Sequence, residues 1–252
     1  MIYVRTALFR KLDRNPALQL GKHFLKAEDR KDTIIALESN ELKQLLDTVE
    51  RNYKEDYPLF LLLARTGLRI GEALALKWDD IDFNERSIEV RRAVYKSRVT
   101  KPKSGKIRIV DMSLQLTKTL KAYELACKKK GIALGLGDLP EYVFTNKHGR
   151  IIQSYNWRKQ IFYKVIKKAG IKKIRIHDLR HTYATLRISK GDNVADVSKQ
   201  LGHHSVKFTM DAYYHWFPGK KKSEVDGLDD PAYKFSTHPN ASYMHPELVK
   251  TG

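Results

Sequence analysis

Apolar residues at helical spacing, repeatedly followed by glycine, constrain the fold of this chain more than any other feature of its sequence. The first such segment follows Ser39 or Asn40, either of which can cap a helix, and carries apolar residues on one face up to Val49. Further helices are expected over residues 59–64, 70–77, 114–130, 155–169, 178–189, 194–202 and 205–215. The glycines expected to end four of these helices are Gly67, Gly131, Gly170 and Gly202.

One stretch has the alternation of a strand instead. Ile88, Val90 and Val94 fall on one side of it, and a basic segment over residues 100–110 follows, with Ser104–Gly105 as its turn. These residues predict a small antiparallel hairpin or a three-stranded sheet. The expected fold class is therefore mainly α-helical with a small antiparallel β-sheet.

The composition indicates a globular protein with a polyanionic partner. Hydrophobic residues make up 42% of the 252 residues, enough for a packed core, and the formal net charge is +19. Nucleic acid is the foremost candidate partner, and a generally adhesive basic protein, such as a ribosomal one, is the alternative. Three regions are expected: a basic arm or linker over residues 1–32, a globular domain over 33–217 and a mobile tail over 218–252.

The single cysteine, Cys127, excludes an intramolecular disulfide and any cysteine-based zinc site. Its helical spacing from Leu116, Leu120 and Tyr123 predicts a packed core position rather than a reactive thiol. The longest apolar run, residues 59–64, is too short to span a bilayer, and the N-terminus lacks the apolar stretch of a signal peptide. The expected protein is soluble and intracellular.

Segments far apart in the chain carry groups that can handle phosphate. They are residues 66–72, 177–181, 201–203 and 213–215. The arginine forks of Arg69 and Arg180 match phosphate oxygens, and the hydroxyl of Tyr213 can act as a covalent nucleophile. These groups suit the breaking and rejoining of a phosphodiester bond, without an evident pair of carboxylates or a metal cluster.

Each residue also has a purely structural interpretation. His177 and Arg180 are three residues apart at a helix start, where they share one face and where an anion is favoured. His177 could equally be a cap residue and Arg180 a solvated charge. Arg69 could simply pair with Glu72 or Asp79.

Two other functions compete for the last helices. Residues 194–202 and 205–215 could form a helix-turn-helix, although the second helix is too apolar for a strong base-reading surface. His203, His204 and His215 could ligate a metal, but no carboxylate or cysteine lies at suitable spacing, which disfavours that alternative.

Tyr213 is a better candidate nucleophile than Tyr214. It shares a helical face with Val206 and Met210, which predicts a packed ring whose hydroxyl can still reach a polar site. Tyr214 points about a third of a turn away along an ideal helix.

Taken together, the four motifs resemble those of the tyrosine recombinases, the phage-type integrases. Their pattern is Gly-Leu-Arg-x-x-Glu, then His-x-x-Arg-His, then Leu-Gly-His, then Tyr-x-His, and all four occur here in that order within residues 39–216. The resemblance implies that Arg69 and Arg180 clamp the scissile phosphate and that Tyr213 is the nucleophile. It also implies that His177 and His203 are further phosphate ligands and proton-transfer partners.

The family's β-hairpin lysine, which protonates the leaving 5′ oxygen, is expected at Lys103, with Lys101 as the alternative. The implied reaction needs no nucleotide cofactor and no metal. Asn15–Ala17 and the basic stretch after them resemble the linker between the family's N-terminal DNA-binding domain and its catalytic domain. Residues 1–32 are therefore expected to be a remnant of that first domain, and residues 33–217 the catalytic domain alone.

The implied function is that of a site-specific recombinase or integrase that forms a 3′-phosphotyrosyl intermediate. Relaxation of DNA by a type IB topoisomerase and non-catalytic DNA binding are the alternatives. The implied partners are double-stranded DNA, further copies in a tetramer on DNA and accessory DNA-bending proteins, with no membrane. The implied location is the prokaryotic cytoplasm, on the nucleoid when bound to DNA.

Overall fold

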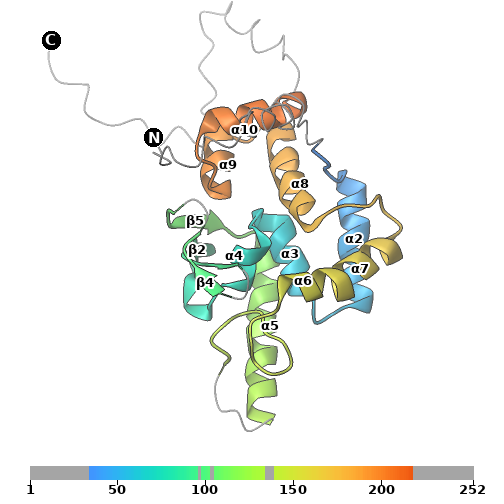
Figure 1. Ribbon diagram of the computed structural model, residues 1–252, viewed down its shortest axis with the longest axis vertical. Helices are drawn as coiled ribbons and strands as arrows, with labels where there is room; N and C mark the ends of the chain where they lie inside the picture. The colour runs from blue at the N-terminus through green and yellow to red at the C-terminus, as the bar shows by residue number, and fades with distance from the viewer. Residues whose placement is uncertain (1–33, 96–97, 103–104, 134–138, 218–252) are drawn as a thin grey trace, which may run out of the picture.

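The computed structural model describes residues 34–95, 98–102, 105–133 and 139–217, and helices form most of this part of the chain (Figure 1). From the first described helix to the last strand, the elements are α2 (Ser39–Asn52), α3 (Tyr57–Thr66), α4 (Ile70–Leu74), η3 (Trp78–Asp80), β1 (Ile81–Asp82), β2 (Ser87–Val90), β3 (Ala93–Tyr95), β4 (Arg98–Thr100) and β5 (Arg108–Asp111). They are followed by α5 (Leu114–Ala133), α6 (Ser154–Trp157), the short π-helix η4 (Arg158–Phe162), α7 (Tyr163–Ala169), α8 (Ile176–Ser189), α9 (Val194–Leu201), α10 (Val206–Tyr213) and η5 (Tyr214–Trp216). The expected fold class is confirmed. The expected arm and tail lie outside the described residues.

The strands form two small antiparallel sheets. One has the order β1-β2-β5, with Ile88 of β2 opposite both Ile81 and Val110, and the other pairs β3 with β4. The single alternating strand expected around Ile88 and Val94 is therefore wrong, because the chain leaves the first sheet after Val90. Part of the expected turn at Ser104 lies outside the described residues.

A large apolar core surrounds α3, and we call it the leucine core. Residues 58–64 of α3 are buried on every side, because the helix packs against α2, α4, α5 and α8. Figure 1 shows α3 near the centre of the molecule, among these helices. An all-round apolar sequence is what such a central helix requires. The remaining core side chains come from α2, α4, the three-stranded sheet, α5, α6, η4, α7, the first turn of α8 and the segments that connect these elements.

A second, smaller apolar group lies where α8, α9 and α10 meet, and we call it the tyrosine cluster. Its buried members are Tyr183, Ala184, Ile188, Val197, Leu201 and Tyr213. The helix α8 belongs to both groups, since Leu179 lies in the leucine core and Tyr183 one turn later lies in the tyrosine cluster. Figure 1 shows α9 and α10 stacked at one end of the molecule, against the end of α8.

Glycine at position 71 lets α4 and β3 approach each other closely. A Cβ atom there would lie 2.5 Å from the carbonyl oxygen of Val94, which is nearer than any side chain tolerates. The hairpin of β3 and β4 is thereby held against the helix that begins directly after Arg69.

Several helix boundaries differ from expectation. The first helix is capped by Glu38, whose N–H donates to the Glu41 carboxylate over 2.8 Å, and not by Ser39 or Asn40. Helix α5 continues through Gly131, which is buried, and so does not end there. The helix expected over residues 155–169 is interrupted by the short π-helix η4.

Two side-chain expectations also need correction. Cys127 is partly buried beside Tyr123 and is not a core residue. Val206 and Met210 are 40% and 46% exposed, although Tyr213 on the same predicted face is buried. No helix in the described part of the chain is long and apolar enough to cross a membrane.

Candidate active site

Five of the six candidate residues converge where α4, α8 and the turn between α9 and α10 meet. The electrostatic environment of His177 includes Arg69 and Arg180, and that of His203 includes the same two arginines. Tyr213 in turn lies close enough to Arg180 for the charge of that guanidinium to act on the pKa of its hydroxyl. The structure therefore brings Arg69, His177, Arg180, His203 and Tyr213 into one site.

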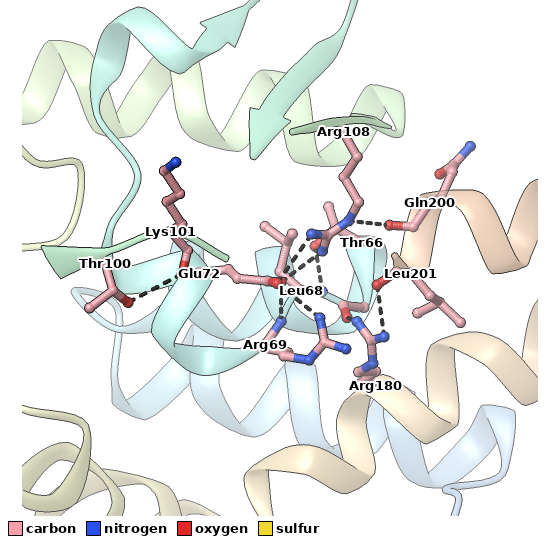
Figure 2. Close-up of polar contacts among 11 residues, drawn as sticks. Thr66, Leu68, Arg69, Glu72, Thr100, Lys101, Arg108, Arg180, Gln200 and Leu201 are labelled. Carbon is pink, nitrogen blue, oxygen red and sulfur yellow. Dashed lines mark hydrogen bonds and ion pairs between the residues drawn. The ribbon is translucent and has the colours of Figure 1, made fainter. Parts of the chain in front are cut away.

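The sixth candidate, Lys103, lies outside the described residues. Its alternative, Lys101, is exposed and directly follows β4. Figure 2 shows the Lys101 side chain directed away from Arg69 and Arg180. The hairpin of β3 and β4 thus lies beside the site, but the side chain of Lys101 does not reach the two arginines.

Arg180 is held by the ends of two helices. Its Nη1 donates to the carbonyl of Gly67 over 2.8 Å and its Nη2 donates to the carbonyl of Leu201 over 2.7 Å (Figure 2). Gly67 caps the C-terminus of α3 and Leu201 ends α9, so both carbonyls lie where a helix carries partial negative charge. The side chain is only 2% exposed, and its guanidinium is fixed before any ligand arrives.

The sequence explains why the backbone can offer these carbonyls. Gly67 has a φ of 63°, in the left-handed region, and a Cβ atom there would lie 2.6 Å from Tyr183 Cδ1 and 2.8 Å from Leu201 Cδ2. Glycine is the residue that tolerates both the backbone angle and the close packing.

Burial and the charge of Arg69 lower the pKa of Arg180 to about 9, so Arg180 remains a cation at neutral pH.

Arg69 is positioned by a buried carboxylate. Its backbone N–H and its Nη1 each donate to Glu72 over 3.0 Å, as the structural interpretation of this residue predicted. Glu72 is 1% exposed, and burial alone would raise its pKa. The hydrogen bonds and charges of Arg108 and Arg69 outweigh that effect and lower the pKa, so Glu72 is ionised.

The second partner of Glu72 is Arg108, which sequence reasoning missed. Arg108 donates from Nη1 and Nη2 to both Glu72 oxygens, over 3.1 and 2.7 Å, and from Nε to the Gln200 carbonyl over 2.8 Å (Figure 2). Its signal in the sequence was its place two residues before Val110, on the inward side of a strand where an apolar residue is usual. Arg108 thus joins β5 to α4 and to the end of α9.

Tyr213 lies at the centre of a group of aromatic rings. It is 1% exposed, and its Oη lies 2.8 Å from Nδ1 of His181. The ring of His203 lies nearly parallel to the Tyr213 ring, and His177 contacts His181 edge to face. Tyr214 is 71% exposed and turns to solvent.

Burial and the nearby cations change the acidities of these groups. Burial raises the pKa of Tyr213 to about 12, with Arg180 acting in the opposite direction. Desolvation, followed by the charges of Arg180 and Arg69, lowers the pKa of His203 to about 3. Desolvation and the charges of His181, Arg180 and Arg69 lower the pKa of His177 to about 4, although one side of this residue is open to solvent. Both histidines are therefore neutral at pH 7 in the unliganded site.

A groove of about 1050 Å³ runs beside the site. It is bounded by β5 on one side and by the end of α9 and the start of α10 on the other. Arg69, Lys106, Lys199 and His203 are among its lining residues, together with the carboxylates of Glu89, Asp111 and Asp196. Within the described residues, no group of three or more histidine, cysteine or acidic side chains could hold a metal ion.

Comparison with known proteins places this arrangement in a family. Residues 36–219 match the model of the phage integrase family. The chain is 34% identical over 190 residues to a tyrosine recombinase XerC-like protein of Caldanaerobacter subterraneus subsp. tengcongensis, which covers 68% of this chain and 48% of that protein. It is 32% identical over 200 residues to the ICEBs1 integrase of Bacillus subtilis, which covers 75% of this chain and 53% of that protein. The chain thus spans about half the length of these curated relatives.

Solved structures show the same fold. The crystal structure of XerA recombinase matches with a TM-score of 0.58 and 29% identity, over 78% of this chain and 65% of that one. The catalytic domain of bacteriophage HP1 integrase matches with a TM-score of 0.51 and 22% identity, over 79% of this chain and 99% of that domain. The match over most of the chain confirms the resemblance carried by the four motifs, and this chain belongs to the phage integrase family.

Proposed function

We propose that this chain is the catalytic part of a site-specific tyrosine recombinase that cuts and rejoins double-stranded DNA. The observation that carries the proposal is the convergence of the buried Tyr213 with two arginines, Arg69 and Arg180, that are fixed in place beforehand. Its similarity to a XerC-like tyrosine recombinase and to an integrase supports the same reaction.

The two arginines act on the scissile phosphate. Their guanidinium groups bind its non-bridging oxygens, on which negative charge concentrates in the transition state. Because Gly67, Leu201 and Glu72 already hold them, little reorganisation is needed when the phosphate arrives. Loss of one such donor costs roughly 10²–10³ in rate, or about 3–4 kcal/mol.

The reaction consists of two transesterifications. The Tyr213 oxygen attacks the phosphorus, the bond to the 5′ oxygen breaks, and a 3′-phosphotyrosyl link conserves the energy of the phosphodiester. A 5′ hydroxyl of a partner strand then attacks that link and releases Tyr213. His177 and His203, neutral in the unliganded site, serve as further hydrogen-bonding partners of the phosphate and as proton-transfer groups.

The leaving 5′ oxygen requires a proton, and a hairpin lysine supplies it. Lys103 is the first candidate and Lys101 the second. If Lys103 is the acid, then Lys103→Ala should be rescued selectively by a substrate with a 5′ thiol leaving group, because a thiolate leaves without protonation. The Lys101→Ala variant is the matched control, and selective rescue of that variant instead would move the role to Lys101.

The partners follow from the same chemistry. Double-stranded DNA is the substrate, and strand exchange between two duplexes implies several copies of the protein on DNA, for which we propose a tetramer, with accessory DNA-bending proteins. We also propose that residues 33–217 are the catalytic domain, that residues 1–32 are a linker and that residues 218–252 are a tail. The high positive charge supports binding to the DNA backbone.

Trapping the covalent intermediate tests the proposal. The protein is incubated with a library of nicked duplexes of randomised sequence, in which cleavage near the nick releases a short fragment and traps the adduct. Mass spectrometry of the adduct should find the DNA on Tyr213. Tyr213→Phe should form no adduct and should still bind DNA, because only the hydroxyl is removed, whereas Tyr214→Phe should behave like the unaltered chain. An adduct on Tyr214, or one formed by Tyr213→Phe, would contradict the assignment of the nucleophile.

A further inference from the structure

His181 is the histidine whose ring nitrogen the structure places against the nucleophile. Its Nδ1 lies 2.8 Å from Tyr213 Oη, a normal hydrogen-bond distance, and the two ring centroids are 5.9 Å apart. His181 follows Arg180 directly on α8, in the interior of that helix, so its backbone position is well defined. The contact spans 32 residues of sequence and is therefore a product of the tertiary fold.

The neighbouring histidines are engaged differently. Nδ1 of His203 lies 2.7 Å from the hydroxyl of Thr209, which is fully buried, and the His203 ring lies parallel to the Tyr213 ring at a centroid distance of 6.4 Å. His203 therefore turns the face of its ring toward the Tyr213 ring, whereas His181 directs a ring nitrogen at the Tyr213 hydroxyl. His177 contacts His181 edge to face and so lies one ring further from Tyr213.

We propose that His181 is the catalytic base that removes the proton of Tyr213 when the DNA strand is cut. As the Tyr213 oxygen forms its bond to phosphorus, its hydrogen passes to Nδ1 of His181, and the bond from phosphorus to the 5′ oxygen breaks. The 5′ oxygen takes a proton from the hairpin lysine. When a 5′ hydroxyl later displaces Tyr213, the hydrogen of that hydroxyl passes to the hairpin lysine, and His181 returns its proton to the tyrosine oxygen. The inference rests on the proposed function.

The surroundings of Tyr213 make such an acceptor necessary. A tyrosine with a pKa of about 12 is almost entirely protonated at neutral pH, so its nucleophilicity depends on a base within hydrogen-bonding reach. Once the proton has moved, Arg180 lies close enough to stabilise the phenolate charge. A neutral imidazole with its hydrogen on Nε2 offers at Nδ1 the lone pair that this transfer requires.

Charged and titratable groups from α8, α4 and the turn before α10 surround the pair. Arg180 and His177 lie beside His181 on α8, Arg69 comes from the start of α4, and His203 comes from the turn before α10. Transfer to His181 adds a positive charge near these cations, and the bound phosphate, with its growing negative charge, offsets it. The base is therefore expected to act only in the complex with DNA.

The test measures the single-turnover rate of adduct formation on a nicked substrate chosen from the library. The unaltered chain is compared with His181→Ala, His181→Gln and His148→Gln, an exposed histidine outside the site that serves as control. The rate should fall about 10²–10⁴-fold in both His181 variants, the usual range for loss of a general base, and stay unchanged in the control. Added imidazole should restore the rate of His181→Ala, and that recovery should follow the fraction of imidazole that is unprotonated.

The outcomes separate this inference from the function on which it rests. Unaltered rates in the His181 variants would overturn it. A third outcome is a variant that loses rate without rescue by imidazole, while the pH dependence of its remaining rate matches that of the unaltered chain. That combination would show a structural role for His181 and would also overturn the inference. DNA binding and thermal unfolding of His181→Gln establish that the fold persists. If the unaltered chain itself forms no adduct on any nicked duplex, the proposed function fails, and the role of His181 fails with it.

Discussion

The leucine core and the tyrosine cluster share helix α8 but differ in what surrounds their buried side chains. In the leucine core, Phe60 is fully buried against the rings of Trp157 and Phe162. In the tyrosine cluster, the two buried tyrosines each carry a hydroxyl with a polar partner, since Tyr213 contacts His181 and Tyr183 donates to Gln200. Apolar packing stabilises one region, whereas the other combines packing with hydrogen bonds that orient reacting groups.

Polar side chains hold α9 of the tyrosine cluster against α8 and the end of β5. Arg187 donates to the Tyr183 hydroxyl over 3.0 Å and to Asp196 over 2.9 Å. Gln200 donates to Asp111 over 2.6 Å, which ties α9 to the end of β5. The comparison indicates that the leucine core sets the global stability, while these bonds set the position of the tyrosine cluster relative to Arg69.

Removal of an aromatic ring from the leucine core should have the largest effect on stability. Phe60→Ala deletes a fully buried ring and should lower the free energy of unfolding by about 3–5 kcal/mol, because the packed surroundings cannot collapse into the space. Urea denaturation measures this value. The exposed Leu125, replaced by alanine, is the control and should change stability by less than about 0.5 kcal/mol. A loss below about 1 kcal/mol for Phe60→Ala would mean that the leucine core does not dominate stability.

Breaking the ion pair between β5 and α4 should come next. Arg108→Met removes the bidentate partner of Glu72 and should cost about 3 kcal/mol, the low end of the range for a broken buried pair, because Glu72 keeps Arg69 as a partner. DNA cleavage should fall as well, since Glu72, which positions Arg69, is no longer held in place by Arg108. The double variant Arg108→Met with Glu72→Leu, which removes both buried charges, should regain stability but not cleavage. Recovery of cleavage would show that the pair has no positioning role.

A smaller effect is expected from the cap of α9. The Asn193 side chain accepts hydrogen bonds from the N–H groups of Ala195 and Asp196, so Asn193→Ala should destabilise the chain by about 1 kcal/mol. Native-state hydrogen exchange should show faster opening of α9 and α10, with α3 unchanged, if the tyrosine cluster opens independently of the leucine core. Equal acceleration in α3 would mean that the two regions unfold as one unit.

Acidification should lower the stability of the folded chain through the two histidines that lie beside the tyrosine cluster. The folded chain holds the pKa of His203 and His177 at about 3 and about 4, below the value of 6.5 of an unperturbed histidine. Between these values the unfolded chain binds more protons, so stability is complete above pH 6.5 and falls as the pH drops toward about 4. Thermal unfolding from pH 7.5 to pH 4.5 measures the slope. His203→Gln should show a shallower slope, and an identical slope would remove His203 from this account.

Much of this molecule could be predicted from local patterns. The helices around Leu42 and Val197 follow from apolar periodicity, the helix around Leu61 follows from a continuous apolar run that ends at a glycine, and the glycine ends at Gly67, Gly170 and Gly202 follow from the need for a left-handed residue at a helix end. The site residues were found through the motifs that surround them. Arg108 was missed because its alternation with Val110 falls in a basic segment, where a charged residue usually faces solvent.

The contact between His181 and Tyr213 shows where sequence reasoning stops. Both residues stand within recognised motifs, but the sequence does not specify which of three histidines faces the tyrosine hydroxyl. That depends on how α10 packs across α8, and the same packing leaves Val206 and Met210 exposed while it buries Tyr213. Helical periodicity defines a face, but the neighbouring helices determine which part of that face is covered.

By itself, the sequence determined the mainly helical class of the fold, the family and the residues of the candidate site, because periodicity, glycine placement and motif order are local properties. Only the tertiary structure decided that Arg180 is held by two helix ends, that Glu72 is shared by Arg69 and Arg108, and that His181 lies against Tyr213. These arrangements join segments up to 113 residues apart. Burial then changes the acidity of each group, and burial is a property of the packed chain rather than of any stretch of its sequence.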